Sequence, residues 1–308
     1  MDCTNRIRVF HPGDPAVDGR MRRFFQPSQR RRIRKGKQMY STSLKGKIAW
    51  VTGSSRGIGR TIAEFLAECG ADVALHGRSD ARLVQYQEGT TLSDAAEQLS
   101  ARFGVRVLPV HADLGNEEEA RRAAAEVREK LGEPDLLICC AGGDIPDQGK
   151  QDVLHFESRL FHEVLRSNLD STVYCCREIV PAMMKRGSGC VVTIGSIAGC
   201  GGWKTAGHFG AYPVAKAAIH EYTRCLAAYT RHSGVRVNCV IPGNINTPRT
   251  RELYGGDRKT PFPGLSSLEH VGTPEDIASL VLFLCSEGGR YISGQCIRAD
   301  GGEQLSPC

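Results

Sequence analysis

The sequence contains no apolar run that approaches the roughly 20 residues needed to span a membrane as a helix. It does not open with the hydrophobic region of a secretory signal, and no internal repeat is visible. These absences argue against a membrane-embedded protein, a secreted protein and a repeat array. We therefore expect a cytoplasmic protein with no membrane partner.

Cysteines spaced for metal binding are also missing. The chain has thirteen cysteines, an odd number, and no Cys-x-x-Cys. Most lie within apolar stretches, as do Cys139-Cys140, Cys175-Cys176 and Cys239. This distribution is typical of small buried thiols in a reducing compartment. We expect neither a disulfide framework nor a metal site.

Positive charge is concentrated at the beginning of the chain. Residues 1–43 carry eleven Arg and Lys against three Asp, a net charge of +8, so the total of +6 leaves −2 for the remaining 265 residues. The same stretch has three prolines, no sustained periodicity and the run Arg30-Arg31-Arg32-Ile33-Arg34-Lys35. We interpret residues 1–43 as a disordered basic arm.

The origin of this arm stays open. Met39 would make an ordinary start, so the arm could be upstream sequence wrongly included. It could also be an Arg-rich targeting peptide, although the early aspartates, the prolines and the sparse serines argue against that. A further interpretation is that the arm tethers the protein to nucleic acid or to an anionic membrane. Aromatic interleaving is limited to Phe24-Phe25 and no binding module is visible, so we expect no nucleic-acid partner.

From Lys47 onward, apolar runs alternate with helical patterns. The predicted strands cover residues 48–52, 72–76, 105–110, 135–140, 191–194, 235–241 and 296–298. One predicted helix follows the first strand and ends at residue 69. The other predicted helices cover residues 92–102, 116–131, 153–165, 168–186, 212–231 and 274–285. Apolar strands joined by helical crossovers indicate a parallel sheet covered on both faces. We expect residues 44–308 to form one α/β domain, a Rossmann-type doubly wound parallel sheet.

Tyr212 and Lys216 are the first candidate chemical groups. Four residues apart on a helix, they lie on one face, one turn from each other. Pro213 between them is compatible with a helix that begins at about Tyr212. An ammonium near a phenol favours the phenolate and lowers the pKa of the tyrosine, which can then exchange a proton with a carbonyl or an alcohol.

A glycine-rich turn, Gly53-Ser54-Ser55-Arg56-Gly57-Ile58-Gly59, joins the first predicted strand to its helix. Glycines at such a turn let backbone N–H groups and the helix N-terminus approach a pyrophosphate. The spacing is Gly-x-x-x-Gly-x-Gly and not the commoner Gly-x-Gly-x-x-Gly. The context of strand before and helix after favours dinucleotide binding.

These motifs and several others occur in a characteristic order. The others are Asp113, Cys140-Ala141-Gly142, Asn168, Ser196, Pro242-Gly243, Gly294-Gln295 and Asp300-Gly301-Gly302. With this set, the chain from about Leu44 to Glu303 resembles the short-chain dehydrogenase/reductase family, of the Tyr-x-x-x-Lys type found in 3-oxoacyl reductases.

The resemblance implies a role for each catalytic residue. Tyr212 would be the general acid in ketone reduction and the base in the reverse direction. Lys216 would hold the nicotinamide ribose hydroxyls and keep the pKa of the tyrosine low. Ser196 would hydrogen-bond the substrate oxygen, and Asn168 would support Lys216 through a bound water. The hydride would come from the cofactor.

The resemblance also implies the residues that contact the cofactor. They are Gly53, Ser55, Arg56, Gly57, Ile58, Gly59, Arg78, Ser79, Asp113, Leu114, Cys140, Ala141, Gly142, Tyr212, Lys216, Pro242, Gly243, Ile245 and Thr247.

The end of the second strand predicts which dinucleotide binds. NAD-preferring proteins of this fold place an acidic residue there, on the ribose hydroxyls. Here that position is Gly77, followed by Arg78, and Arg56 offers a second cation from the glycine turn. A guanidinium can bind phosphate oxygens bidentately, so the pair predicts a clamp for the 2′-phosphate of NADP(H). We expect the nearest acid, Asp80, to point outward.

Three features depart from the family pattern or extend it. Cys140 replaces an asparagine whose amide supports the centre of the sheet. The interval from Ser196 to Tyr212 is a few residues longer than usual, through the segment 200–210, whose His208 we expect to be a surface or pocket-wall residue. Residues 246–273 form a long polar segment, where the family has a substrate lid. This segment carries a slight excess of basic residues, which hints at a polar or acidic substrate. The alternative is that these charges are simply solvated.

The combined prediction is an NADP(H)-dependent oxidoreductase that interconverts a small-molecule ketone and a secondary alcohol. The alternative is a catalytically silent dinucleotide-sensing protein on the same scaffold, since a fold alone does not define activity. Sensors tend to lose the tyrosine or the lysine, whereas this chain keeps all four catalytic residues. From the resemblance we also expect a homo-oligomer, a tetramer.

Overall fold

The computed structural model describes residues 41–80, 91–144, 152–201, 210–254 and 271–304. The chain divides into two compact units, Met1–Met39 and Tyr40–Cys308. The first unit lies outside the described residues, as do nearly all of the arm of residues 1–43, most of segment 200–210 and residues 255–270 of the expected lid. Among the described helices, none is long and apolar enough to cross a membrane.

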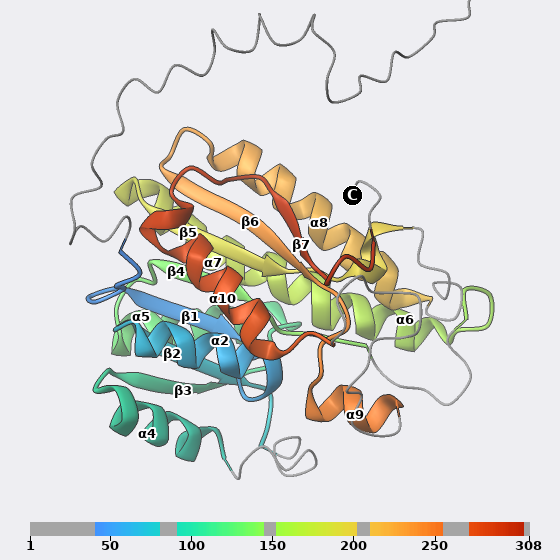
Figure 1. Ribbon diagram of the computed structural model, residues 1–308, viewed down its shortest axis with the longest axis horizontal. Coiled ribbons are helices and arrows are strands. Elements are labelled where there is room, and N and C mark those ends of the chain that lie inside the picture. The colour runs from blue at the N-terminus through green and yellow to red at the C-terminus, as the bar shows by residue number, and fades with distance from the viewer. Residues whose placement is uncertain (1–40, 81–90, 145–151, 202–209, 255–270, 305–308) are drawn as a thin grey trace, which may run out of the picture. The chain divides into compact units, whose positions relative to one another are not determined.

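Seven parallel strands form one sheet in the second unit. In spatial order the sheet is β3-β2-β1-β4-β5-β6-β7 (Figure 1). The strands are β1 (Ile48–Thr52), β2 (Asp72–Gly77), β3 (Val107–His111), β4 (Leu136–Cys139), β5 (Gly189–Ile194), β6 (Val235–Pro242) and β7 (Cys296–Ala299). The predicted α/β class with a doubly wound parallel sheet is confirmed.

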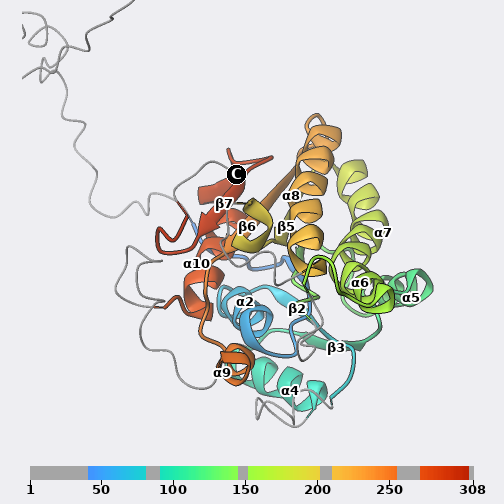
Figure 2. The same cartoon turned by 90° about the vertical axis from the view of Figure 1, so that its right-hand side faces the viewer.

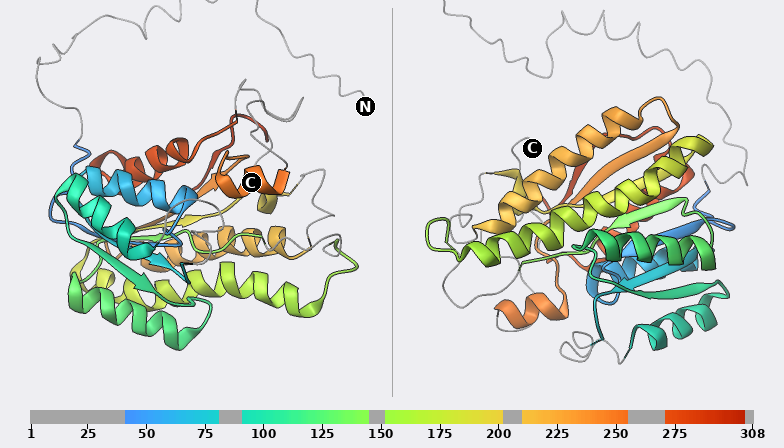
Figure 3. Two further views of the ribbon diagram at one scale, coloured as in Figure 1. Left: turned by 90° about the horizontal axis from the view of Figure 1, so that it is seen from below. Right: turned by 180° about the vertical axis from the view of Figure 1, so that it is seen from behind.

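Helices cover both faces of this sheet. They are α2 (Gly57–Glu68), α4 (Leu92–Phe103), α5 (Glu117–Lys130), α6 (Ser158–Leu165), α7 (Ser171–Arg186), α8 (Ala211–Thr230), α9 (Pro248–Tyr254) and α10 (Pro274–Cys285). Figure 2 separates the two layers, with α2, α4 and α10 on one side and α5, α7 and α8 on the other. Figure 3 shows the same sandwich from below and from behind.

Strand β1 shows why the predicted strands are apolar throughout. Ala49 and Val51 belong to the core beneath α2, α4 and α10, whereas Trp50 belongs to the core beneath α5 and α7. Successive side chains point to opposite faces of a strand, and here both faces are covered. The order of the strands reverses between β1 and β4, and ligands of doubly wound sheets bind at that crevice, outside the carboxyl ends of the strands.

The region between β4 and α7 differs from the prediction. The helix expected from residue 153 begins only at Ser158, because the Asp152 carboxylate accepts N–H bonds from Leu154 (2.8 Å) and His155 (2.9 Å) in a local turn. The two expected helices are also not separated. A π-helical turn, Arg166–Asp170, joins α6 to α7. Such turns are frequently found at functional sites.

Candidate active site

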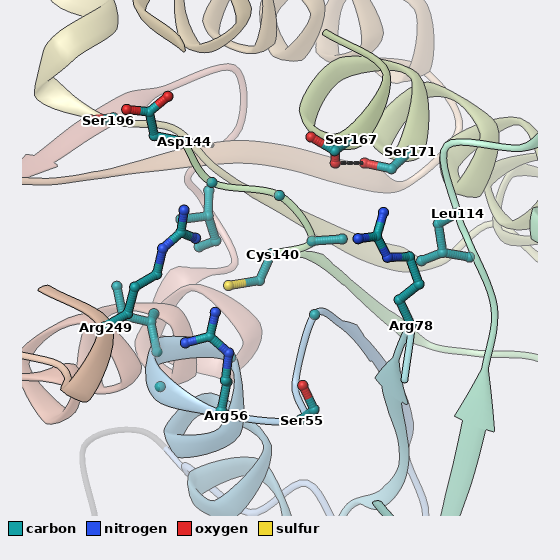
Figure 4. A pocket seen from close by; sticks show the side chains of 18 of the residues that line it. Ser55, Arg56, Arg78, Leu114, Cys140, Asp144, Ser167, Ser171, Ser196 and Arg249 are labelled. Atoms are coloured by element: carbon teal, nitrogen blue, oxygen red, sulfur yellow. Dashed lines mark hydrogen bonds between the residues drawn. The ribbon is translucent and has the colours of Figure 1, made fainter. Parts of the chain in front are cut away.

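A cavity of about 710 Å³ lies at the carboxyl ends of the strands. Its walls contain every residue predicted to contact the cofactor, together with Ser196, Tyr212 and Lys216 (Figure 4). Asn168 is the one predicted site residue that does not line it. The topology therefore brings together residues that are up to 194 positions apart in the chain.

The glycine turn makes close contacts that side chains would prevent. Gly53 has a φ of 65°, and a Cβ there would lie 2.6 Å from the Cα of Ala141. A Cβ at Gly59 would collide with the carbonyl oxygen of Gly53. The turn therefore packs directly on the chain that follows β4, and it directs the N-terminus of α2 at the cavity. A helix N-terminus is a favourable site for phosphate oxygens.

His76, expected from the sequence only to be a strand residue, fastens this turn to the sheet. Its Nδ1 accepts the N–H of Gly53 at 2.9 Å, so Nε2 carries the proton and donates to the carbonyl of Ala112 at 3.0 Å. Burial lowers the pKa of His76 to about 4, which keeps the ring neutral. One buried imidazole thus ties together the chain segments that follow β1 and β3.

Thr52 compensates for the unusual Cys140. The Thr52 hydroxyl accepts the N–H groups of Cys140 (3.0 Å) and Ala141 (3.1 Å) and itself bonds the carbonyl of Ile138 (3.3 Å). Burial raises the pKa of the Cys140 thiol to about 11. The chain at the sheet centre is therefore fixed by a hydroxyl from β1, although position 140 carries no side-chain amide.

Asn168 lies in the π-helical turn and is fully buried. Its Oδ1 accepts the N–H of Gly143 at 2.9 Å, and its Nδ2 donates to the carbonyls of Gly143 (3.0 Å) and Val164 (2.9 Å). A Cβ at Gly142 would collide with this amide. Asn168 therefore fixes the segment that leaves β4 for the cavity. Its predicted link to Lys216 through a water stays a prediction.

Tyr212 lies in the first turn of α8, which begins at Ala211, so the predicted helix start is confirmed. Burial raises the pKa of Tyr212, while a hydrogen bond with the Ser196 side chain and the charge of Arg249 lower it. The net direction contradicts the prediction of a lowered pKa. The ammonium of Lys216 is 5.6 Å from the centre of the Tyr212 ring and donates instead to the carbonyl of Ile194 at 2.9 Å.

Lys216 is buried, with 5% of its surface exposed. Its pKa is lowered to about 8, chiefly by burial and to a smaller extent by the charge of Arg249, while Cys140 and Cys239 act in the opposite direction. The carbonyl of Ile194 supplies one acceptor for the ammonium. The lysine is consequently held at the end of β5, beside the segment that carries Ser196.

His220, one turn after Lys216 on α8, holds the segment of Ser196. The His220 Nε2 accepts the N–H of Ser196 at 3.4 Å, and a Cβ at Gly195 would collide with the ring. Burial lowers the pKa of His220 to about 4, with smaller contributions from Lys216 and Arg224. No sequence pattern identified this neutral histidine, because its partner is a backbone N–H.

Arg56 and Arg78 both extend into the cavity, from the glycine turn before α2 and from the end of β2 (Figure 4). Asp80 does not line the cavity, in agreement with the expectation that it points outward. Its carboxylate accepts the N–H of Leu92 at 2.9 Å and lies 3.2 Å from Nε2 of His111. Asp113 is paired with Arg166, which donates to it at 2.9 Å. The residues at the β2 end of the cavity are therefore mainly cationic.

Further residues line the cavity that no sequence motif assigned to the site. They include Asp144, Asp152, Glu163, Ser167, Ser171, Arg249 and Thr250. Several come from α6, α7 and α9, where the sequence carries no recognisable pattern for a site. Helix α9 itself lies in the segment expected to be a lid. The two ends of that segment meet at a bridge between Ile245 and Gly272, with the Asn246 N–H donating to Gly272 at 2.8 Å.

A doubly wound parallel sheet with a glycine turn at its switch point defines a dinucleotide-binding protein of the Rossmann class. Sequence comparison gives the family. The family model described as Enoyl-(Acyl carrier protein) reductase matches residues 53–304. The chain belongs to the short-chain dehydrogenase/reductase family and is of the 3-oxoacyl reductase type.

Individual relatives agree with this assignment. Cyclohexanol dehydrogenase of Rhodococcus sp. (strain TK6) is 35% identical over 267 residues, which cover 84% of this chain and 96% of the relative. The 3-oxoacyl-(acyl-carrier-protein) reductase FabG of Aquifex aeolicus (strain VF5) is 34% identical over 261 residues, 84% of this chain and 98% of the relative. The structure of L-sorbose reductase from Gluconobacter frateurii, complexed with NADPH and L-sorbose, is 30% identical. It has a TM-score of 0.76 and covers 87% of this chain and 100% of that one.

Proposed function

We propose that the protein is an NADP(H)-dependent oxidoreductase that interconverts a ketone and a secondary alcohol. The observation that carries this proposal is the convergence of Tyr212, Ser196 and Lys216 with the glycine turn on one cavity. Proton-transfer groups and a dinucleotide-binding turn in one cavity suit hydride transfer to a carbonyl. When bound, the nicotinamide supplies the hydride.

Tyr212 moves the proton in this mechanism. Because burial raises its pKa, the phenol is protonated at neutral pH and can donate to the carbonyl oxygen of a ketone. The Ser196 hydroxyl, which hydrogen-bonds the Tyr212 phenol, orients and polarises the same oxygen. Lys216 and Arg249 place positive charge near the phenol and stabilise the phenolate left behind. In the reverse direction the phenolate takes the proton from the alcohol.

The cavity fits a dinucleotide. The close approach of Gly53, Gly59 and Ala141 leaves the α2 N-terminus accessible to a pyrophosphate. Arg56 and Arg78 would hold a 2′-phosphate, and at Gly77 there is no carboxylate to repel it. The relative solved with NADPH supports the same choice.

We also propose a homotetramer. Large apolar or aromatic side chains stand out on α8 and next to β7, where Tyr229 is 74% exposed and Tyr291 is 99% exposed. Aromatic side chains are enriched at protein interfaces, so these two tyrosines are compatible with subunit contacts. We further propose that the protein works in the cytoplasm, since all eleven cysteines that the structure describes are free thiols, as suits a reducing compartment.

An assay of ketone reduction tests the proposed function. The purified protein is mixed with NADPH or NADH and each of cyclohexanone, L-sorbose and a short 3-oxoacyl thioester, and the loss of reduced cofactor is followed by absorbance. We expect turnover of at least one ketone, with higher kcat/KM for NADPH. Binding of NADPH without turnover of any ketone would favour the dinucleotide-sensing alternative.

A further inference from the structure

Arg249 on α9 is a charged side chain in the cavity that carries no proton in the proposed transfer. It lines the cavity, and its charge acts on both Tyr212 and Lys216, lowering the pKa of each. Figure 4 shows its side chain extending into the cavity on the side of Asp144, whereas Arg78 extends into it on the side of Leu114. Arg249 is therefore at the proton-transfer end of the cavity, and Arg78 is at the end formed by β2.

The guanidinium of Arg249 is held in place. A Cβ at Gly143 would collide with it, so the guanidinium packs on the Gly143 backbone, which Asn168 fixes through two hydrogen bonds. The first turn of α9 is fixed as well. The Thr250 hydroxyl donates to the carbonyl of Ile245 at 2.8 Å and accepts the N–H of Thr247, also at 2.8 Å.

Among the residues that the structure describes, none forms an ion pair that neutralises the charge of Arg249. Within the described part of the chain, no carboxylate pairs with it. Four acids line the cavity: Asp113, Asp144, Asp152 and Glu163. Asp113 is paired with Arg166, and Asp144 has an interaction of its own. The Asp152 carboxylate is bonded by the N–H of Leu154 and by the N–H and ring of His155. The charge of Arg249 acts on both Tyr212 and Lys216, whereas the charge of Asp144 acts on Tyr212.

We propose that Arg249 binds an anionic group of the substrate, so that the protein acts on ketones and alcohols that carry a carboxylate. A rigidly held guanidinium without an ion-pair partner matches the planar geometry of a carboxylate. This inference rests on the proposed oxidoreductase function and narrows its substrate class. The carboxylate binds Arg249 while the carbonyl oxygen is at Tyr212 and Ser196.

A matched substrate pair tests the inference. The kcat/KM values for 4-oxocyclohexanecarboxylate and for its uncharged methyl ester are measured with NADPH at low and high salt, in the wild-type protein and in Arg249→Gln. We expect the wild-type protein to prefer the carboxylate by about tenfold to a hundredfold, the usual value of a charge-assisted contact, and to lose part of that preference at high salt. In Arg249→Gln the ratio of the two kcat/KM values should fall by a similar factor.

Arg251→Gln is the matched control, since Arg251 lies on the same helix but does not line the cavity. The ratio should stay within about threefold of wild type in this variant. Arg249→Lys, which keeps the charge but not the bidentate geometry, should restore part of the preference.

Three outcomes are distinguishable. Turnover of the ester and the carboxylate with equal kcat/KM in the wild-type protein would overturn the inference and leave the proposed function intact. A rise of the NADPH KM in Arg249→Gln, with an unchanged ratio of the substrates, would show that Arg249 acts on the cofactor and would also overturn it. If no ketone is turned over, the proposed function itself fails.

Discussion

Burial sets the protonation of the ionisable side chains around the cavity. It raises the pKa of Tyr212 and lowers that of Lys216 to about 8. It also keeps the imidazoles of His76 and His220 neutral, with pKa values of about 4. The phenol of Tyr212 is therefore protonated at neutral pH, and the two histidines act through fixed hydrogen bonds and not through charge.

We propose that single residues at the end of β2 decide the choice between NADPH and NADH. Replacing Arg78 by Ile should lower kcat/KM for NADPH by about tenfold to a hundredfold, because a charge-assisted phosphate contact is lost, and should change the value for NADH little. The double variant Gly77→Asp with Arg78→Ile should move the preference towards NADH. Initial rates at varied cofactor concentration measure both effects.

The structure adds a control to this experiment. A Cβ at Gly77 would lie 3.0 Å from the Cβ of Ser55, so any side chain there presses on the glycine turn. Gly77→Ala introduces this crowding without charge and separates it from the electrostatic effect. Higher kcat/KM with NADH than with NADPH in the wild-type protein would contradict the assignment of Arg56 and Arg78.

At the scale of elements, the π-helical turn supports one wall of the site. The turn directs the Asn168 side chain at the backbone of Gly143, in the segment after β4. Because the guanidinium of Arg249 packs on Gly143, the turn also supports Arg249. Asn168→Ala should lower the free energy of unfolding by about 1–3 kcal/mol, since the partly buried N–H and C=O of Gly143 lose the side-chain amide that bonds them. Urea unfolding measures the loss.

Ser171→Ala is the control for that variant. The Ser171 hydroxyl bonds helical carbonyls of Ser167 (2.8 Å) and Asn168 (3.2 Å), so its removal leaves no isolated donor. We expect it to cost less than about 1 kcal/mol. An Asn168→Ala protein as stable as Ser171→Ala would contradict the structural role of the amide.

The sequence predicted the regular elements better than the site contacts. Apolar strands and amphipathic crossovers placed all seven strands to within two residues, because burial on both faces leaves a continuous pattern. Helix α9 was missed, since a seven-residue helix within a polar segment has no sustained periodicity. His76, His220 and Asn168 bond to the backbone of distant segments, and such pairings leave no local signal in the sequence.

At the scale of the whole molecule, the buried histidines predict how stability depends on pH. The pKa of His76 is lowered from 6.5 to about 4 in the folded state, so the unfolded chain binds a proton first as the pH falls. The stabilisation is present above about pH 6.5 and is lost towards about pH 4, a change of about 3 kcal/mol for this residue. His76→Gln cannot titrate and should flatten the dependence. Urea unfolding at pH 7 and pH 5 measures the change in the free energy of unfolding with pH. An equal change in the wild-type protein and in His76→Gln would contradict the prediction.

The basic arm should be dispensable. We propose that residues 44–308 form the catalytic domain, since β1 begins at Ile48 and the hydrophobic core begins with Leu44. A chain that starts at Met39 should fold, form the same oligomer by light scattering and turn over substrate within about twofold of the full chain. A large loss of activity, or dissociation of the oligomer, would show that the arm packs or assembles the protein.

The central claim is that Tyr212 transfers the proton, and one substitution tests it most directly. Tyr212→Phe keeps the ring and removes the hydroxyl, so NADPH binding, followed by its fluorescence, should be retained. The kcat for reduction of the best ketone should fall by about 10²–10⁴-fold, as is typical when a general acid is lost. A Tyr212→Phe protein that binds NADPH and reduces the ketone at a near-wild-type rate would contradict the account.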